Sequence, residues 1–61
     1  PVTDKLWLDT PAAFVKIIST DGRIVWSQNN YVEKQEIEVH SLKAGVYIIR
    51  TDKGASRFVK N

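Results

Sequence analysis

The chain has 61 residues, a net charge of +2 and no cysteine. This length allows one small domain with a thin core, because a domain of about 60 residues buries only about 60% of the surface that its unfolded chain exposes. The missing cysteines exclude disulfides and thiolate metal sites, and no apolar run approaches the roughly 18 residues of a membrane-spanning helix.

The basic residues are spread along the sequence and do not cluster in one segment. Binding to nucleic acid needs a concentrated positive footprint, so no nucleic-acid partner is expected. The nine basic residues are Lys5, Lys16, Arg23, Lys34, Lys43, Arg50, Lys53, Arg57 and Lys60.

Short apolar runs rich in β-branched and aromatic residues favour strands over helices. In a first strand over residues 4–9, Leu6 and Leu8 share one face and Trp7 points to the other; Pro11 then ends it, since proline cannot donate to a ladder. Further strands are expected over residues 13–18, 23–28, 32–40, 46–51 and 55–60. Such a series of short strands with tight turns predicts an antiparallel sandwich or open barrel.

The dipeptide Asp21-Gly22 stands between two apolar segments and predicts a β-hairpin with a type I′ turn. That register pairs Thr20 with Arg23, Ile18 with Val25 and Ile17 with Trp26. It places on the core face Val15, Ile17, Ile24 and Trp26, and on the other face Phe14, Ile18 and Val25 with Lys16, Ser27 and Arg23. A shift of one residue would exchange the two faces.

The segment over residues 32–40 alternates at its end, which is typical of a half-buried strand. Ile37 and Val39 are expected to face the core, while Glu36, Glu38 and His40 face solvent. Leu42 is expected to fill the end of the core.

Two registers compete for the last hairpin. A two-residue loop of Lys53-Gly54 would place Arg50 opposite Arg57, and like charges directly opposite each other are unfavourable. A three-residue loop over residues 52–54 pairs Ile48 with Phe58 and Tyr47 with Val59, and we prefer it. Residues 46–49 are apolar on both faces, so the face away from the core needs cover from a loop, from Trp7 or from a partner.

No catalytic residue, cofactor or metal site is expected. The single histidine, His40, precedes Ser41, and neighbouring side chains on a strand diverge, so the two do not form a nucleophile and base. Glu36 and Glu38 share a face, but charged residues are usual on the solvated face of a strand, and a calcium site needs several oxygen ligands from a tight loop.

Three motifs occur in an order that strongly resembles the C-terminal sorting domain of proteins exported by the type IX secretion system. Residues 20–23, Thr-Asp-Gly-Arg, match the turn of that family. Residues 41–47, Ser-Leu-Lys-Ala-Gly-Val-Tyr, match its most specific segment, and residues 57–61, Arg-Phe-Val-Lys-Asn, match its terminal strand. Pro1-Val2 matches the end of the Pro-Asn-Pro stretch with which members open, so the resemblance spans the whole chain.

The resemblance implies an all-β, antiparallel immunoglobulin-like β-sandwich of about six or seven short strands. It implies that residues 1–61 are a single domain at the C-terminus of a longer secreted protein, consistent with a start at Pro1 and not at Met. Such a domain passes through the periplasm, is recognised by the outer-membrane translocon and is often removed by a sortase, leaving the cargo at the cell surface or secreted. The residues expected to bind the partner are Gly45, Val46, Tyr47, Arg57, Phe58, Val59 and Lys60.

Two further possibilities follow from the residues. An immunoglobulin-like accessory module that binds carbohydrate or mediates adhesion would use Trp7 and Tyr31 as stacking residues. An exposed sheet edge would also allow a strand-exchanged dimer.

Overall fold

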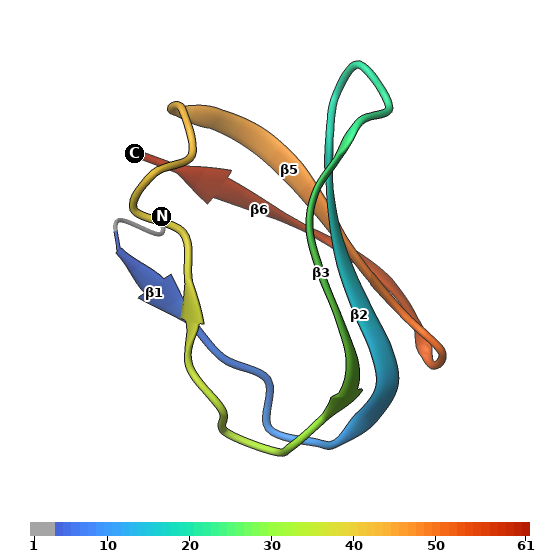
Figure 1. Ribbon diagram of the computed structural model, residues 1–61. Helices are drawn as coiled ribbons and strands as arrows, with labels where there is room; N and C mark the ends of the chain where they lie inside the picture. The colour runs from blue at the N-terminus through green and yellow to red at the C-terminus, as the bar shows by residue number, and fades with distance from the viewer. Residues whose placement is uncertain (1–3) are drawn as a thin grey trace.

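The computed structural model describes residues 4–61, which form two antiparallel sheets without a helix (Figure 1). The larger sheet has the order β3-β2-β5-β6 and the smaller one pairs β1 with β4. The strands are β1 (Lys5–Leu6), β2 (Ala12–Ser19), β3 (Ile24–Tyr31), β4 (Ile37–Glu38), β5 (Gly45–Thr51) and β6 (Gly54–Lys60). Nothing in these residues is a helix long and apolar enough to cross a membrane.

The two sheets enclose one thin core, as predicted for a sandwich. Alternate residues of β2 and β5 point into it, since Val15 and Ile17 are fully buried and Tyr47 and Ile49 are each 7% exposed. Ile37 and Val39, predicted to face the core, are also fully buried. The core is completed by Ala12 and Tyr31, with Leu6, Leu8, Trp26, Leu42 and Phe58 packed against it.

The first hairpin corrects the predicted turn. Gly22 alone in the turn has a positive φ, of 87°, whereas a type I′ turn needs positive φ at both central residues. The Gly22 amide donates to the Ser19 carbonyl at 3.0 Å and the Ser19 amide donates to the Arg23 carbonyl at 2.8 Å. The loop is therefore three residues long, with glycine in the left-handed position.

This longer loop moves Ile24 out of the predicted core. Ile17 pairs with Trp26 as predicted, but Ile18 pairs with Ile24 and not with Val25, because the register shifts by one residue between Ile17 and Ile18. Val25 is the extra residue of a β-bulge, which reverses the faces beyond it. Ile24 is accordingly 57% exposed.

The last hairpin adopts neither of the two registers considered. Thr51 pairs with Gly54, Ile48 with Arg57 and Tyr47 with Phe58, so the loop consists of residues 52 and 53. In this register Arg50 and Arg57 are diagonal neighbours and not directly opposite each other, and two aromatic side chains come together; both changes favour it.

The strands predicted over residues 4–9 and 32–40 shrink to β1 and β4, each of two residues. Their flanking segments are held by isolated hydrogen bonds and not by a ladder. The Lys34 amide donates to the Leu8 carbonyl at 2.7 Å, and the side-chain amides of Gln28 and Gln35 bond each other reciprocally at 2.7 and 2.8 Å. Lys34 has a φ of 62°, which interrupts extended backbone here.

Candidate docking surface

The two segments predicted to bind a partner lie side by side at one edge of the larger sheet. In the register of β5 with β6, Gly45 is opposite Lys60, Val46 opposite Val59 and Tyr47 opposite Phe58. Within residues 4–61 strand β6 pairs only with β5, so its other edge carries backbone groups outside that ladder (Figure 1). We call this paired region, residues 45–48 with 57–60, the edge hairpin.

Gly45 begins the hairpin with a φ of 152°, a conformation that residues with a side chain rarely adopt. The chain enters β5 through this conformation, which favours glycine.

Three of the predicted residues face inward and hold the hairpin together. The rings of Tyr47 and Phe58 stack with their centroids 5.6 Å apart and their planes inclined by 22°. The Tyr47 hydroxyl donates to the Lys43 carbonyl at 2.7 Å, so it is engaged within the chain. Lys60 is only 6% exposed, and its ammonium group donates to the Asn61 backbone oxygen at 2.9 Å.

The other predicted residues face outward. Val46 and Val59 are 38% and 47% exposed and lie opposite each other, and Arg57 is exposed on the same face of β6. Ile48, opposite Arg57, is 39% exposed and was not among the predicted contact residues. The sequence could have predicted an exposed Ile48, since β5 is apolar on both faces and only one face can meet the core.

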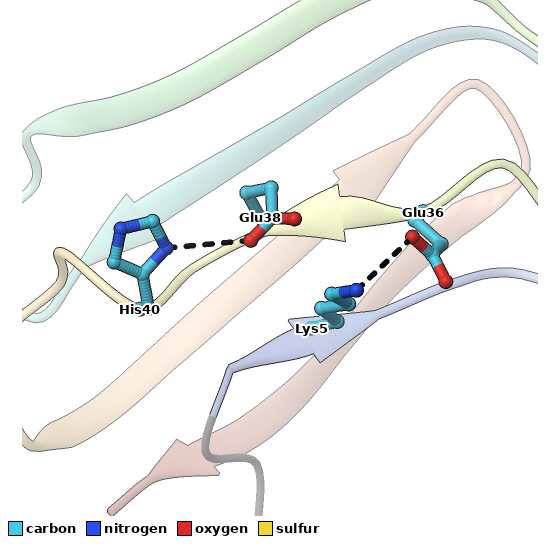
Figure 2. A network of polar contacts seen from close by, with 4 residues as sticks. All are labelled: Lys5, Glu36, Glu38 and His40. Atoms are coloured by element: carbon cyan, nitrogen blue, oxygen red, sulfur yellow. Dashed lines mark hydrogen bonds and ion pairs between the residues drawn. The ribbon is translucent and has the colours of Figure 1, made fainter.

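The acidic residues near His40 make ordinary polar contacts at the surface (Figure 2). The Lys5 ammonium lies 3.4 Å from the Glu36 carboxylate, and Nδ1 of His40 lies 3.3 Å from the Glu38 carboxylate. All four side chains are largely exposed. Within residues 4–61 no three His, Cys, Asp or Glu side chains gather closely enough to hold a metal ion.

One groove of the described surface lies between residues 8–12 and 49–56. Its ionisable side chains are Asp9 and Lys53, and neither a histidine nor a cysteine lines it.

The aromatic platform required for the carbohydrate-binding alternative does not exist as expected. Trp7 is 57% exposed, but Tyr31 is 2% exposed. The Tyr31 hydroxyl accepts a hydrogen bond from the Leu8 amide and donates one to the Gln35 carbonyl. A ring this deeply buried cannot stack on a sugar, so the prediction for Tyr31 is wrong.

Comparison with known families gives one match, to the family described as the secretion system C-terminal sorting domain, over residues 1–61. The chain belongs to this family. Neither the search of curated proteins nor the search of solved structures gives a match.

Membership makes this sorting domain a signal for type IX secretion, the route by which its proteins reach the cell surface or the medium. The turn at residues 20–23 and the edge hairpin, which carried the resemblance in sequence, belong to neighbouring hairpins of the larger sheet, and Ser19 beside the turn pairs with Tyr47 of the edge hairpin. The Pro1-Val2 motif lies outside the described residues.

Proposed function

We propose that the sorting domain is a non-catalytic docking module whose edge hairpin is bound by the outer-membrane translocon. The observation that carries this proposal is the pairing of residues 45–48 with residues 57–60 at a sheet edge. Two separate motifs thereby form one continuous surface with an unpaired strand edge beside it. Such an edge is a usual template for strand addition by a partner.

The predicted contact residues divide into two roles in this proposal. Val46, Arg57 and Val59 contact the translocon, because their side chains face outward. Tyr47, Phe58 and Lys60 position the hairpin from the inner face, and Gly45 sets the course of the backbone into it.

The domain serves a cargo that precedes residue 1 in a longer protein. It folds in the periplasm, carries the cargo to the translocon and reaches the outer membrane, where a sortase removes it. Exchange of β6 between two copies would give a dimer, since β6 is the edge strand of the larger sheet in the part of the chain that the structure describes.

Surface delivery of a reporter tests the proposal. Residues 1–61 are fused behind a fluorescent protein that carries an export signal, in a host with an intact type IX system. Removing residues 57–61 should leave the reporter in the periplasm. The paired change Val46→Ser/Val59→Ser, which leaves the inward residues in place, should also reduce delivery.

Val32→Ser is the matched control, because Val32 is 62% exposed and lies outside the edge hairpin. Its delivery should equal that of the parent fusion. Normal delivery of the truncated fusion, or equal losses for the hairpin variant and the Val32 control, would contradict the proposal.

A further inference from the structure

Charge is segregated between the larger sheet and the rest of the molecule. Strands β2, β3, β5 and β6 contain Lys16, Arg50, Arg57 and Lys60 and no acidic residue. The seven acidic residues all lie in turns, loops or the small sheet: Asp4, Asp9, Asp21, Glu33, Glu36, Glu38 and Asp52. The basic residues that look scattered in sequence are therefore brought together by the topology.

Three of these cations share the outer face of the sheet. Lys16 and Arg50 are direct cross-strand partners. Arg50 is opposite Ala55, two residues from Arg57 along β6, so Arg57 is a diagonal neighbour of Arg50. The adjacent row runs across all four strands of the sheet. Ile24 lies opposite Ile18, and Ile18 lies opposite Ile48 on its other side. Ile48 in turn lies opposite Arg57, the last residue of the row. We call Lys16, Ile18, Ile48, Arg50 and Arg57 the cationic face.

No carboxylate within residues 4–61 lies within 4 Å of the three cationic groups, since the described ion pairs involve other residues. The acidic residues of the two nearest turns are engaged elsewhere. Asp52 accepts a hydrogen bond from the Ala13 amide at 2.9 Å, and Asp21 bonds the Ser19 hydroxyl and pairs with Arg23.

This arrangement does not serve the stability of the domain itself. Like charges directly opposite each other on neighbouring strands, here Lys16 and Arg50, are destabilising. The ammonium of Lys16 lies 5.3 Å from the centroid of the Phe14 ring, a contact that only partly offsets the repulsion. The half-exposed isoleucines beside these cations add an apolar surface that also lacks cover.

We propose that the cationic face binds an acidic protein surface of the export machinery, in which carboxylates surround aliphatic side chains. The inference rests on the docking function proposed above and extends its site from the edge hairpin across β5 to β2. Carboxylates of the partner would pair with Lys16, Arg50 and Arg57, and its aliphatic residues would cover Ile18 and Ile48. Complementary charge of this kind gives an interface its specificity and speeds association.

The observations favour protein over an anionic membrane as the occupant. Membrane-surface binding is helped by aromatic anchors at the interface beside the cations. The exposed tryptophan, Trp7, lies in the segment next to β1, whereas the cations lie in the other sheet. The aromatic ring beside Lys16, that of Phe14, is partly buried. Recognition of lipid headgroups also relies on denser clusters of about four to eight basic residues.

The test uses the reporter fusion described above. Lys16→Glu/Arg50→Glu reverses two charges of the cationic face. Lys34→Glu/Lys43→Glu is the matched control, since it changes the net charge equally at exposed positions outside this face. Lys16→Arg/Arg50→Lys keeps the charge. Resistance to protease is measured for every fusion as a check on folding. If the charge-reversed fusion is less resistant than the parent, the neutral variant Lys16→Gln/Arg50→Gln replaces it in the test.

We expect delivery by the charge-reversed fusion to fall at least about tenfold, because like charges would then face each other across the interface. The control and the charge-keeping variant should be delivered normally. If removal of residues 57–61 blocks delivery while charge reversal has no effect, the docking function stands and this inference fails. If that removal has no effect, the docking function itself fails.

A second measurement separates the two kinds of occupant. The fusions are mixed with vesicles of phosphatidylglycerol and phosphatidylcholine, and binding is followed by flotation. Equal behaviour of the parent and charge-reversed fusions supports a protein partner. Vesicle binding that is lost on charge reversal would assign the face to lipid and overturn the proposal.

Discussion

The Tyr31 hydroxyl accepts a hydrogen bond of 2.8 Å from the amide of Leu8, a residue 23 positions earlier in the chain. The same hydroxyl donates to the Gln35 carbonyl at 2.5 Å. One buried side chain of β3 thus holds both segments that flank the small sheet. Strands β1 and β4 are only two residues long, so few hydrogen bonds join them. The two bonds of the Tyr31 hydroxyl therefore help to stabilise the small sheet.

Replacing Tyr31 by Phe should therefore lower the free energy of unfolding by about 1–3 kcal/mol, because the Leu8 amide and the Gln35 carbonyl both lose their partner. Urea unfolding followed by tryptophan fluorescence measures the change. Tyr47→Phe is the matched control, since it removes a single bond, to the Lys43 carbonyl. A larger loss for the control would show that the Tyr31 contacts do not hold the small sheet.

Because of the bulge at Val25, the change from isoleucine to valine should destabilise the domain at residue 17 but have almost no effect at residue 24. Ile17→Val should cost about 0.5–1.5 kcal/mol, because Ile17 is fully buried. Ile24→Val should cost almost nothing, because Ile24 is 57% exposed. Comparable losses at the two sites, measured by urea unfolding, would mean that the hairpin keeps the regular register.

Replacing Gly22 by a residue that disfavours a positive φ should lower the free energy of unfolding. Gly22→Ala is expected to cost about 1–2 kcal/mol, since a left-handed conformation brings the Cβ atom close to a carbonyl oxygen. No other part of the fold lies within 4 Å of the added Cβ, so the cost comes from the local backbone conformation alone. Gly22→Asn should be milder, because asparagine tolerates this conformation, and equal melting temperatures for the two variants would argue against the assigned turn.

Lys60 should contribute through its aliphatic stem more than through its charge. Lys60→Met keeps a chain of similar length at this buried position and should change the free energy of unfolding by less than about 1.5 kcal/mol. Lys60→Asp removes that packing and buries a carboxylate, so its loss should be much larger. If surface delivery fails for a fully folded Lys60→Met fusion, then the ammonium group itself is recognised.

Much of this protein follows from local sequence. The alternation of Ile37 and Val39 with charged neighbours predicted the buried face of the segment near β4, since every second residue of a strand shares a side. The apolar runs located β2, β3, β5 and β6 to within a few residues. The ordered motifs identified the family, because they occur at fixed places along the chain and need no structure to be read.

Registers and side-chain roles were decided by packing between segments distant in sequence. The turn at Gly22 and the bulge at Val25 shift the register of the first hairpin by one residue. Local sequence preferences cannot distinguish this register from the regular one. The shift nevertheless exposes Ile24 to solvent. The sequence allowed Tyr31 to be an exposed ring that stacks on a sugar. In the structure Tyr31 is buried, and its hydroxyl accepts a hydrogen bond from the distant Leu8 amide.

The sequence by itself therefore determined the all-β class, the family and part of the core, because period-two patterns and motifs are local properties. Only the tertiary structure decided which residues share the outer face. Lys16, Arg50 and Arg57 are separated by 34 and 7 positions in the chain, and they meet because β2 and β6 both pair with β5. Cross-strand neighbours depend on strand order and register, which the whole core fixes together.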